Sequence, residues 1–238
     1  MASQPSPERR AGPMREGSQR SSEGRLGPRA ERTRAAILRA AEALFAEGGF
    51  ASTRLEDVAS AVGIRRASLF YYFRDKVELY EAVLGDVLGG LREQLEPVLL
   101  GPGTLAERAE AAVSAWIDFI SLRPALARLL LREVADGSPT REPPLARQIR
   151  PFFEMVERVL AASAGDPLVR RAPVDPVNLA SSIAGSTVFF VAAMPTLLPG
   201  LHFDPLAPER LEAHRREMLG ITRRLLGSRE ADNGRETT

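Results

Sequence analysis

Two arginines, a serine and four aromatic rings lie within the short segment GIRRASLFYYF, residues 63–73. Guanidinium groups stay charged and bind phosphate oxygens through paired hydrogen bonds, and hydroxyl groups beside them can bind phosphates or base edges. The rings could instead belong to a hydrophobic core. The segment therefore predicts an aromatic core, or a surface that contacts an anion, or a division between the two.

Helical geometry divides this segment between two faces. At about 100° per residue, Leu69 and Phe73 point inward together, whereas Ser68 and Tyr71 fall on the opposite side. Arg65 stands at the expected start of the helix, where free N–H groups carry a partial positive charge and where arginine cannot accept a capping hydrogen bond. A cation is disfavoured there unless it has an anionic partner, so we expect the outward face to bind phosphate.

The composition limits other kinds of chemistry. The 238 residues include no cysteine and two histidines, and the formal net charge is +1. Disulfides, thiolate metal sites and cysteine nucleophiles are thereby excluded, no metal site is expected, and the lack of cysteine is compatible with the cytoplasm, where we expect the protein. The sequence has no phosphate-binding loop with its lysine, no metal-binding His-Glu helix and no serine nucleophile motif, so we predict neither an enzyme nor a cofactor.

Helix signals divide residues 31–80 into a small helical unit. Apolar residues recur every three to four positions from Thr33 onward. A tight glycine turn before a helix that exposes cations, a hydroxyl and rings is typical of a helix-turn-helix, whose second helix enters the major groove of DNA. The signals are a stop at Gly48-Gly49, a capping box of Thr53 with Glu56, a turn at Gly63, a third helix from about Arg65, and Asp75 with Glu78 opening a fourth.

The remaining chain is helical in pattern too, so the predicted fold is all-α with about nine helices. A larger bundle is expected over residues 81–228, and residues 1–30 and 229–238 are expected to be disordered tails because they hold few large apolar residues. Arginines of the first tail could alternatively contact DNA phosphates. The signals are a capping box of Thr104 with Glu107, a break at Pro124, and helix starts at Asp175-Pro176 and Asp204-Pro205.

Residues Thr33–Leu84, TRAAILRAAEALFAEGGFASTRLEDVASAVGIRRASLFYYFRDKVELYEAVL, resemble the N-terminal DNA-binding domain of the TetR/AcrR family of transcriptional regulators. The likeness runs through the GF after helix one, VASAVGI at the turn, SLFYYF of the recognition helix and the following DK. It implies phosphate contacts by Thr53, Tyr72 and Lys76, the single lysine of the chain. It also implies that bases or the groove edge are faced by Arg66, Ala67, Ser68 and Tyr71.

The sequence departs from the family pattern at three positions. Arg65 replaces a usual capping serine, Ala67 stands where glycine is common, and Phe70 lacks the hydroxyl of the tyrosine that often reaches a phosphate. We hypothesise that Arg65 adds a phosphate contact to the same surface.

Residues 176–203 contain no charged side chain, which raises the possibility of a membrane span. Interrupting prolines at 195 and 199, polar residues in the first half and a face of small residues favour burial in a subunit interface instead. The resemblance implies a homodimer formed by the last two long helices, at about 175–195 and 206–227. A dimer would present two recognition helices about one DNA turn apart to a palindromic site.

The resemblance further implies a small-molecule effector pocket among the middle helices, and so a repressor that the effector releases from its operator. The alternative is a dimeric DNA-binding regulator without such an effector, controlled by a protein partner or constitutive. The predicted lining residues are Trp116, Phe119, Phe152, Phe153, Met155, Phe189 and Phe190.

Overall fold

The computed structural model describes residues 27–136, 143–166 and 175–226, and throughout these ranges the secondary structure is helical. The all-α prediction is confirmed. The predicted tails lie outside the described residues, apart from residues 27–30. In chain order the helices are α1 (Pro28–Ser52), α2 (Leu55–Val62), α3 (Arg66–Leu69), α4 (Lys76–Leu99), α5 (Leu105–Leu122), α6 (Pro124–Asp136), α7 (Pro144–Ala162), α9 (Pro176–Ala180), the π-helical turn η1 (Ser181–Gly185), α10 (Ser186–Ala192), α11 (Met194–Leu197), the 3-10 turn η2 (Pro199–Leu201) and α12 (Pro208–Leu225).

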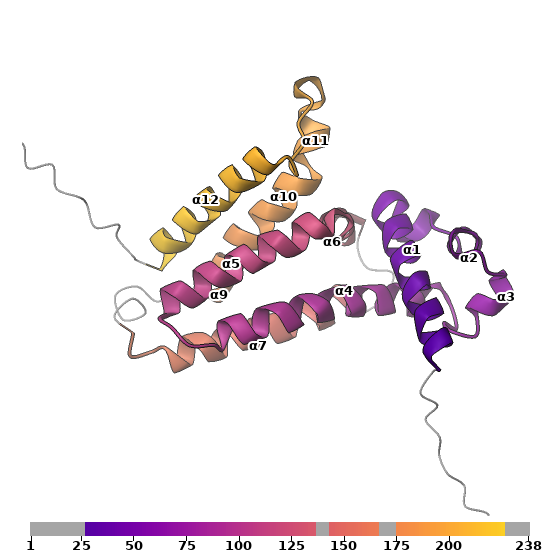
Figure 1. Cartoon of the computed structure of the whole chain (residues 1–238), viewed down its shortest axis with the longest axis horizontal. Coiled ribbons are helices and arrows are strands. Elements are labelled where there is room, and N and C mark those ends of the chain that lie inside the picture. Colours follow the sequence, from indigo (N-terminus) through magenta and orange to yellow (C-terminus); the bar gives the residue numbers. More distant parts are fainter. Residues whose placement is uncertain (1–26, 137–142, 167–174, 227–238) are drawn as a thin grey trace, which may run out of the picture.

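Helices α1, α2 and α3 form a compact unit at one end of the molecule, and α4 runs from it into the rear bundle (Figure 1). The inward faces of these helices share a core, because apolar side chains three or four apart lie on one side of a helix. Its members include Ile37, Leu38, Phe45, Leu69 and Phe73, all of which are buried. This unit is hereafter the head.

The first helix begins earlier than its apolar periodicity indicates. It starts at Pro28, after Gly27 in an extended conformation, because proline suits the first position of a helix. The first turns of α1 are largely exposed and need no apolar face, so hydrophobic periodicity does not reveal them. The predicted stop at Gly48-Gly49 is confirmed: Gly49 has φ 79° and breaks the helical backbone before a last short turn.

The capping signals were correct except at two places. Asp75, Thr104 and Asp175 accept hydrogen bonds from the first backbone N–H groups of α4, α5 and α9. The capping box at Thr53 is wrong, because α2 begins after Arg54 without a side-chain cap. The start at Asp204-Pro205 is also early, since α12 begins at Pro208.

In the rear bundle, α4 packs between α5 and α7, α6 lies along α1, and α12 lies on α5. Residues 176–192 are continuously helical through α9, the turn η1 and α10, and this helix packs on α6 and α5. None of the described helices is long and apolar enough to cross a membrane.

Candidate nucleic-acid interface and effector site

The two faces predicted for residues 63–73 are present in the structure. Leu69 and Phe73 are almost fully buried in the head, whereas Tyr71 is 71% exposed and Phe70 is 44% exposed. A short turn after α3 positions the rings, because the backbone N–H groups of Tyr72 and Phe73 both donate to the Leu69 carbonyl oxygen. The inner residues anchor the segment and leave its outer side chains to the solvent.

The two arginines at the start of α3 differ in their partners. Arg66 forms an ion pair with Glu56 of α2 at 2.7 Å, and its guanidinium lies over the Phe70 ring. Arg65 stands at the N-cap, makes no side-chain capping bond and forms no ion pair with another described residue. Of these two arginines, Arg65 therefore needs no exchange of partners before it binds an anion.

The remaining outward positions are open. Ala67 and Ser68 are exposed, and Tyr72 is half-buried with its ring packed edge-on against Tyr71. Arg54, which the sequence reasoning missed, is exposed at the start of α2. It could have been found from its place immediately before the first turn of that helix, where N–H groups are free and anions bind.

The structure shows the Thr53 side chain engaged within the head. Its side chain is buried, and its hydroxyl lies 2.8 Å from the Gly49 carbonyl oxygen and 3.2 Å from that of Leu44. A hydroxyl that donates back to the preceding helix cannot present that proton to a phosphate. The Thr53 side chain therefore belongs to the end of α1.

Lys76 is engaged in the same way. Its ammonium lies 2.8 Å from the Phe50 carbonyl oxygen and 3.2 Å from those of Ala51 and Thr53, and 4.4 Å from the centre of the Phe50 ring. An ammonium has three donors, and all three are matched here. Lys76 thus closes the end of α1 within the described residues, and a phosphate would have to displace these carbonyl groups.

Most of the seven side chains predicted to line an effector pocket belong to the packed core, and Phe153 is half-buried. Trp116, Phe119 and Met155 are buried in the main core, with Phe152 packed against it. Phe190 stacks on His214 of α12, with the ring centres 4.2 Å apart, and Phe189 is 47% exposed.

An open pocket of about 620 Å³ lies instead between α4 and α7. Of the predicted set it includes Met155, and most of its other side chains are charged. Neither of its arginines forms an ion pair with a described residue. The lining residues are Arg92, Glu96, Pro151, Glu154, Met155, Glu157, Arg158 and Ala161.

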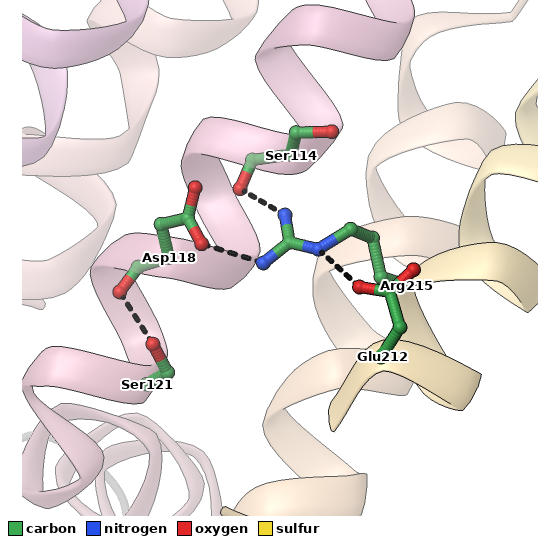
Figure 2. A network of polar contacts seen from close by, with 5 residues as sticks. All are labelled: Ser114, Asp118, Ser121, Glu212 and Arg215. Carbon is green, nitrogen blue, oxygen red and sulfur yellow. Dashed lines mark hydrogen bonds and ion pairs between the residues drawn. The ribbon is translucent and has the colours of Figure 1, made fainter. Parts of the chain in front are cut away.

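Polar contacts fix α12 on α5 (Figure 2). One terminal nitrogen of Arg215 lies 2.5 Å from Asp118 and the other lies 3.1 Å from the Ser114 carbonyl oxygen, while Glu212 approaches the guanidinium from its own helix. Further along, Arg223 binds both carboxylate oxygens of Glu110.

A histidine lies between α10 and α12. The Nε2 atom of His214 is 3.1 Å from the hydroxyl oxygen of Thr187, which is fully buried and donates its own proton to the Ile183 carbonyl oxygen. The Thr187 oxygen must therefore accept a hydrogen bond that the Nε2–H group of His214 donates. Burial lowers the pKa of His214, because the protonated ring is less well hydrated there.

Known protein families match both the N-terminal and the C-terminal part of the chain. Residues 37–83 match the family described as "Bacterial regulatory proteins, tetR family", and residues 106–221 match "Tetracyclin repressor-like, C-terminal domain". The HTH-type transcriptional regulator RutR of Escherichia coli K12 is 29% identical over 167 residues, which cover 67% of this chain and 74% of RutR.

Solved structures share the fold. AibR in complex with isovaleryl coenzyme A and operator DNA has a TM-score of 0.61 at 18% identity, covering 79% of this chain and 97% of AibR. FadR from Bacillus subtilis in complex with stearoyl-CoA has a TM-score of 0.61 at 15% identity, covering 82% of this chain and 99% of FadR. With an exposed helix-turn-helix in its head and both halves matched, the chain belongs to the TetR family of DNA-binding transcriptional regulators.

Proposed function

We propose that this regulator is a repressor which binds a palindromic operator as a homodimer and is released by a small-molecule effector. The observation that carries the DNA contact is the exposed side of residues 65–72, held rigidly by the buried Leu69 and Phe73. The proposed contacts are made by Arg65, Arg66, Ala67, Ser68, Tyr71 and Tyr72, with residues 31–80 as the DNA-binding domain and residues 81–228 as the effector and dimerisation domain.

A selection of bound duplexes from a random pool tests the operator, and we expect a palindrome. Arg65→Ala should weaken binding to the selected duplex and to its base-substituted versions by the same factor, because one phosphate contact is lost. The slope of log K against log[salt] should fall by about one. Arg128→Ala is the control, since Arg128 is exposed on α6, outside the head. An unchanged slope would show that Arg65 touches no phosphate.

The outer face of the helix 176–192 supports the homodimer. Val177, Ser181, Gly185 and Phe189 lie four residues apart and are exposed, and a side chain added at Gly185 would meet no atom within 4 Å beyond its neighbours and its own helix backbone. Such a face lets a second helix approach closely, whereas an exposed large ring in a monomer is unfavourable. We propose that it packs against its symmetry mate together with α12.

Light scattering tests this assembly. The chain has a mass of 25.9 kDa, and we expect twice that value at micromolar concentration. Phe189→Glu, which buries two charges across the symmetry axis, should shift the equilibrium toward monomer. The wild-type chain running as a monomer would refute the homodimer.

The pocket between α4 and α7 is our candidate effector site. Arg92 and Arg158 offer charged donors there and Met155 an apolar surface, a combination suited to an anionic compound with an apolar portion. The CoA thioesters bound to AibR and FadR are compounds of this kind. Thermal-shift screening should find such a ligand, and the same ligand should reduce operator affinity.

The alternative regulator without an effector also has support. Most of the predicted lining residues are packed in or against the core, and the pocket between α4 and α7 also carries three glutamates that oppose an anion. A broad screen in which no compound raises the melting temperature would favour this alternative. Arg92→Glu supplies the matched test, since it should abolish a thermal shift that arises in this pocket.

A further inference from the structure

Side-chain donors gather at the carbonyl end of α1. A helix leaves its last carbonyl groups without partners in the helix itself, so they must bind elsewhere. Here donors from the end of α1, from α4 and from α6 all reach this end. The acceptors are the carbonyl oxygens of Leu44, Ala46, Glu47, Gly49, Phe50, Ala51 and Thr53.

Arg132, in the last turns of α6, spans two of these carbonyl groups. Its Nε atom lies 3.0 Å from the Ala46 oxygen, and a terminal nitrogen lies 2.5 Å from the Glu47 oxygen. The planar guanidinium suits such neighbouring acceptors. Gly49 leaves room for it, because a Cβ at this glycine would lie 3.2 Å from Asp136 Oδ2 and 3.6 Å from a terminal nitrogen of Arg132.

The residue after Arg132 joins α6 to α4 at the same place. Glu133 is buried and accepts a hydrogen bond from the hydroxyl group of Tyr80. The Tyr80 ring packs edge-on against Phe45 and Phe50 of α1, with ring centres 4.9 Å and 5.1 Å apart. Arg132 therefore joins α6 to α1, and Glu133 joins α6 to α4.

The end of α1 also determines where the recognition elements begin. Two residues, Thr53 and Arg54, connect α1 to α2, and α3 packs on α2. A rotation or loosening of the last turn of α1 must move the start of α2. A displacement of α6 along α1 would withdraw the guanidinium from two carbonyl groups that no other side chain of the described residues reaches.

We propose that Arg132 is a positioning residue for DNA binding: from the rear bundle it caps the end of α1 and so sets the angle at which α2 and α3 meet DNA. This inference rests on the proposed operator binding. Lys76 closes the neighbouring carbonyl groups from within α4, so the head itself stays folded when Arg132 is withdrawn. Arg132 then acts on orientation more than on folding.

The test uses the full chain and a duplex selected with the wild-type protein from a random pool. Affinities of wild type, Arg132→Met, Arg132→Lys and Arg128→Met are measured across a range of salt concentrations. Arg128 is the matched control, because it lies one turn earlier on α6 and is exposed. Melting temperatures and amide hydrogen exchange at residues 50–57 are recorded for each variant.

We expect Arg132→Met to weaken binding about tenfold, the range typical of coupling between sites, with an unchanged salt slope because no phosphate contact is lost. Faster exchange at residues 50–57 should accompany this loss, Arg132→Lys should be intermediate, and Arg128→Met should remain within about twofold of wild type.

Two results would overturn the proposal. One is wild-type affinity for folded Arg132→Met, which would leave the residue a purely structural cap; the other is a lower salt slope, which would mean that Arg132 itself touches DNA. Should Arg132→Met fail to fold, Arg132→Lys with wild-type affinity and exchange would be equally decisive against it. If the wild-type chain selects no duplex, operator binding itself fails, an outcome separate from both.

Discussion

Cationic side chains join helices at several places in this molecule, and two of these places differ in their main acceptors. At the end of α1, Lys76 and Arg132 bind backbone carbonyl oxygens. Between α5 and α12, Arg215 and Arg223 bind the carboxylates of Asp118 and Glu110. Carbonyl acceptors are uncharged and are present whatever the side chain, whereas carboxylates can be screened, protonated or replaced. The head is therefore held by contacts that tolerate changes of sequence and solution, and the proposed dimer helix by contacts that respond to them.

The largest effect is expected at the head. Lys76→Met would remove the donors from three carbonyl groups at a partly buried turn, which should lower the free energy of unfolding by about 2 kcal/mol. Arg74→Met is the control, because Arg74 is 83% exposed and pairs from just before α4 with Glu78 in its first turn. Urea denaturation gives both values. Equal losses in the two variants would remove the distinction between carbonyl and carboxylate contacts.

A smaller, salt-sensitive effect is expected on α12. Arg215→Met should cost about 1 kcal/mol at low ionic strength, since the guanidinium is largely covered while Asp118 is mostly exposed. High salt should reduce the cost of Arg215→Met, because Arg215 binds a carboxylate. The cost of Lys76→Met should stay unchanged, because Lys76 binds uncharged carbonyl groups. Arg216→Met, which alters an exposed pair with Glu212, is the control. The same salt response at both sites would contradict the comparison.

A pH dependence should distinguish the regions further. His214 has a lowered pKa, so the folded protein favours the neutral ring; its contribution to stability is complete above the ordinary value of 6.5 and is lost as the pH falls below it. His214→Gln should flatten this part of the profile of melting temperature against pH. A profile that is identical in the variant would exclude His214 as its source.

The smallest effect is expected from Glu42 on α1, and its sign is opposite. Burial raises the pKa of this carboxyl group, although Arg123, 3.6 Å away, partly offsets the burial. Its contribution is complete below the ordinary value of 4.5 and is lost as the pH rises through the higher folded value. Glu42→Gln should therefore gain stability relative to wild type as the pH increases. A relative loss over that range would show that the ion pair with Arg123 dominates.

Local signals in the sequence sufficed for the order of helices in the head and for its buried face, but not for the starts of α1 and α2. The spacing of Leu69, Tyr71 and Phe73 predicts their burial and exposure because helical periodicity is a property of neighbouring residues. The capping signals at Asp75 and Thr104 succeeded for the same reason. At Thr53 the capping signal was wrong, because the hydroxyl group donates to the Gly49 carbonyl oxygen of α1 and does not cap α2.

The partners of the cations could not be predicted from the sequence. Lys76 lies more than 20 residues from the carbonyl groups that it binds, and Arg132 more than 80 from its own. Every residue has a backbone carbonyl oxygen, so the identity of a residue does not reveal that its carbonyl group binds a distant arginine. Nothing in the sequence therefore distinguishes Arg132 from the exposed Arg128. The predicted pocket residues meet a related difficulty, because large apolar side chains fill a core as readily as they line a cavity.

The chain has one lysine, and its side-chain amine is the one that three carbonyl groups surround at the end of α1. Acylating reagents attack the neutral, accessible amine, so Lys76 should react only while the junction between α1 and α4 is open. The rate at which Lys76 is acylated would then report how often this junction opens in the intact regulator. Mass spectrometry of the peptide that contains this single lysine would therefore follow the junction without any introduced residue.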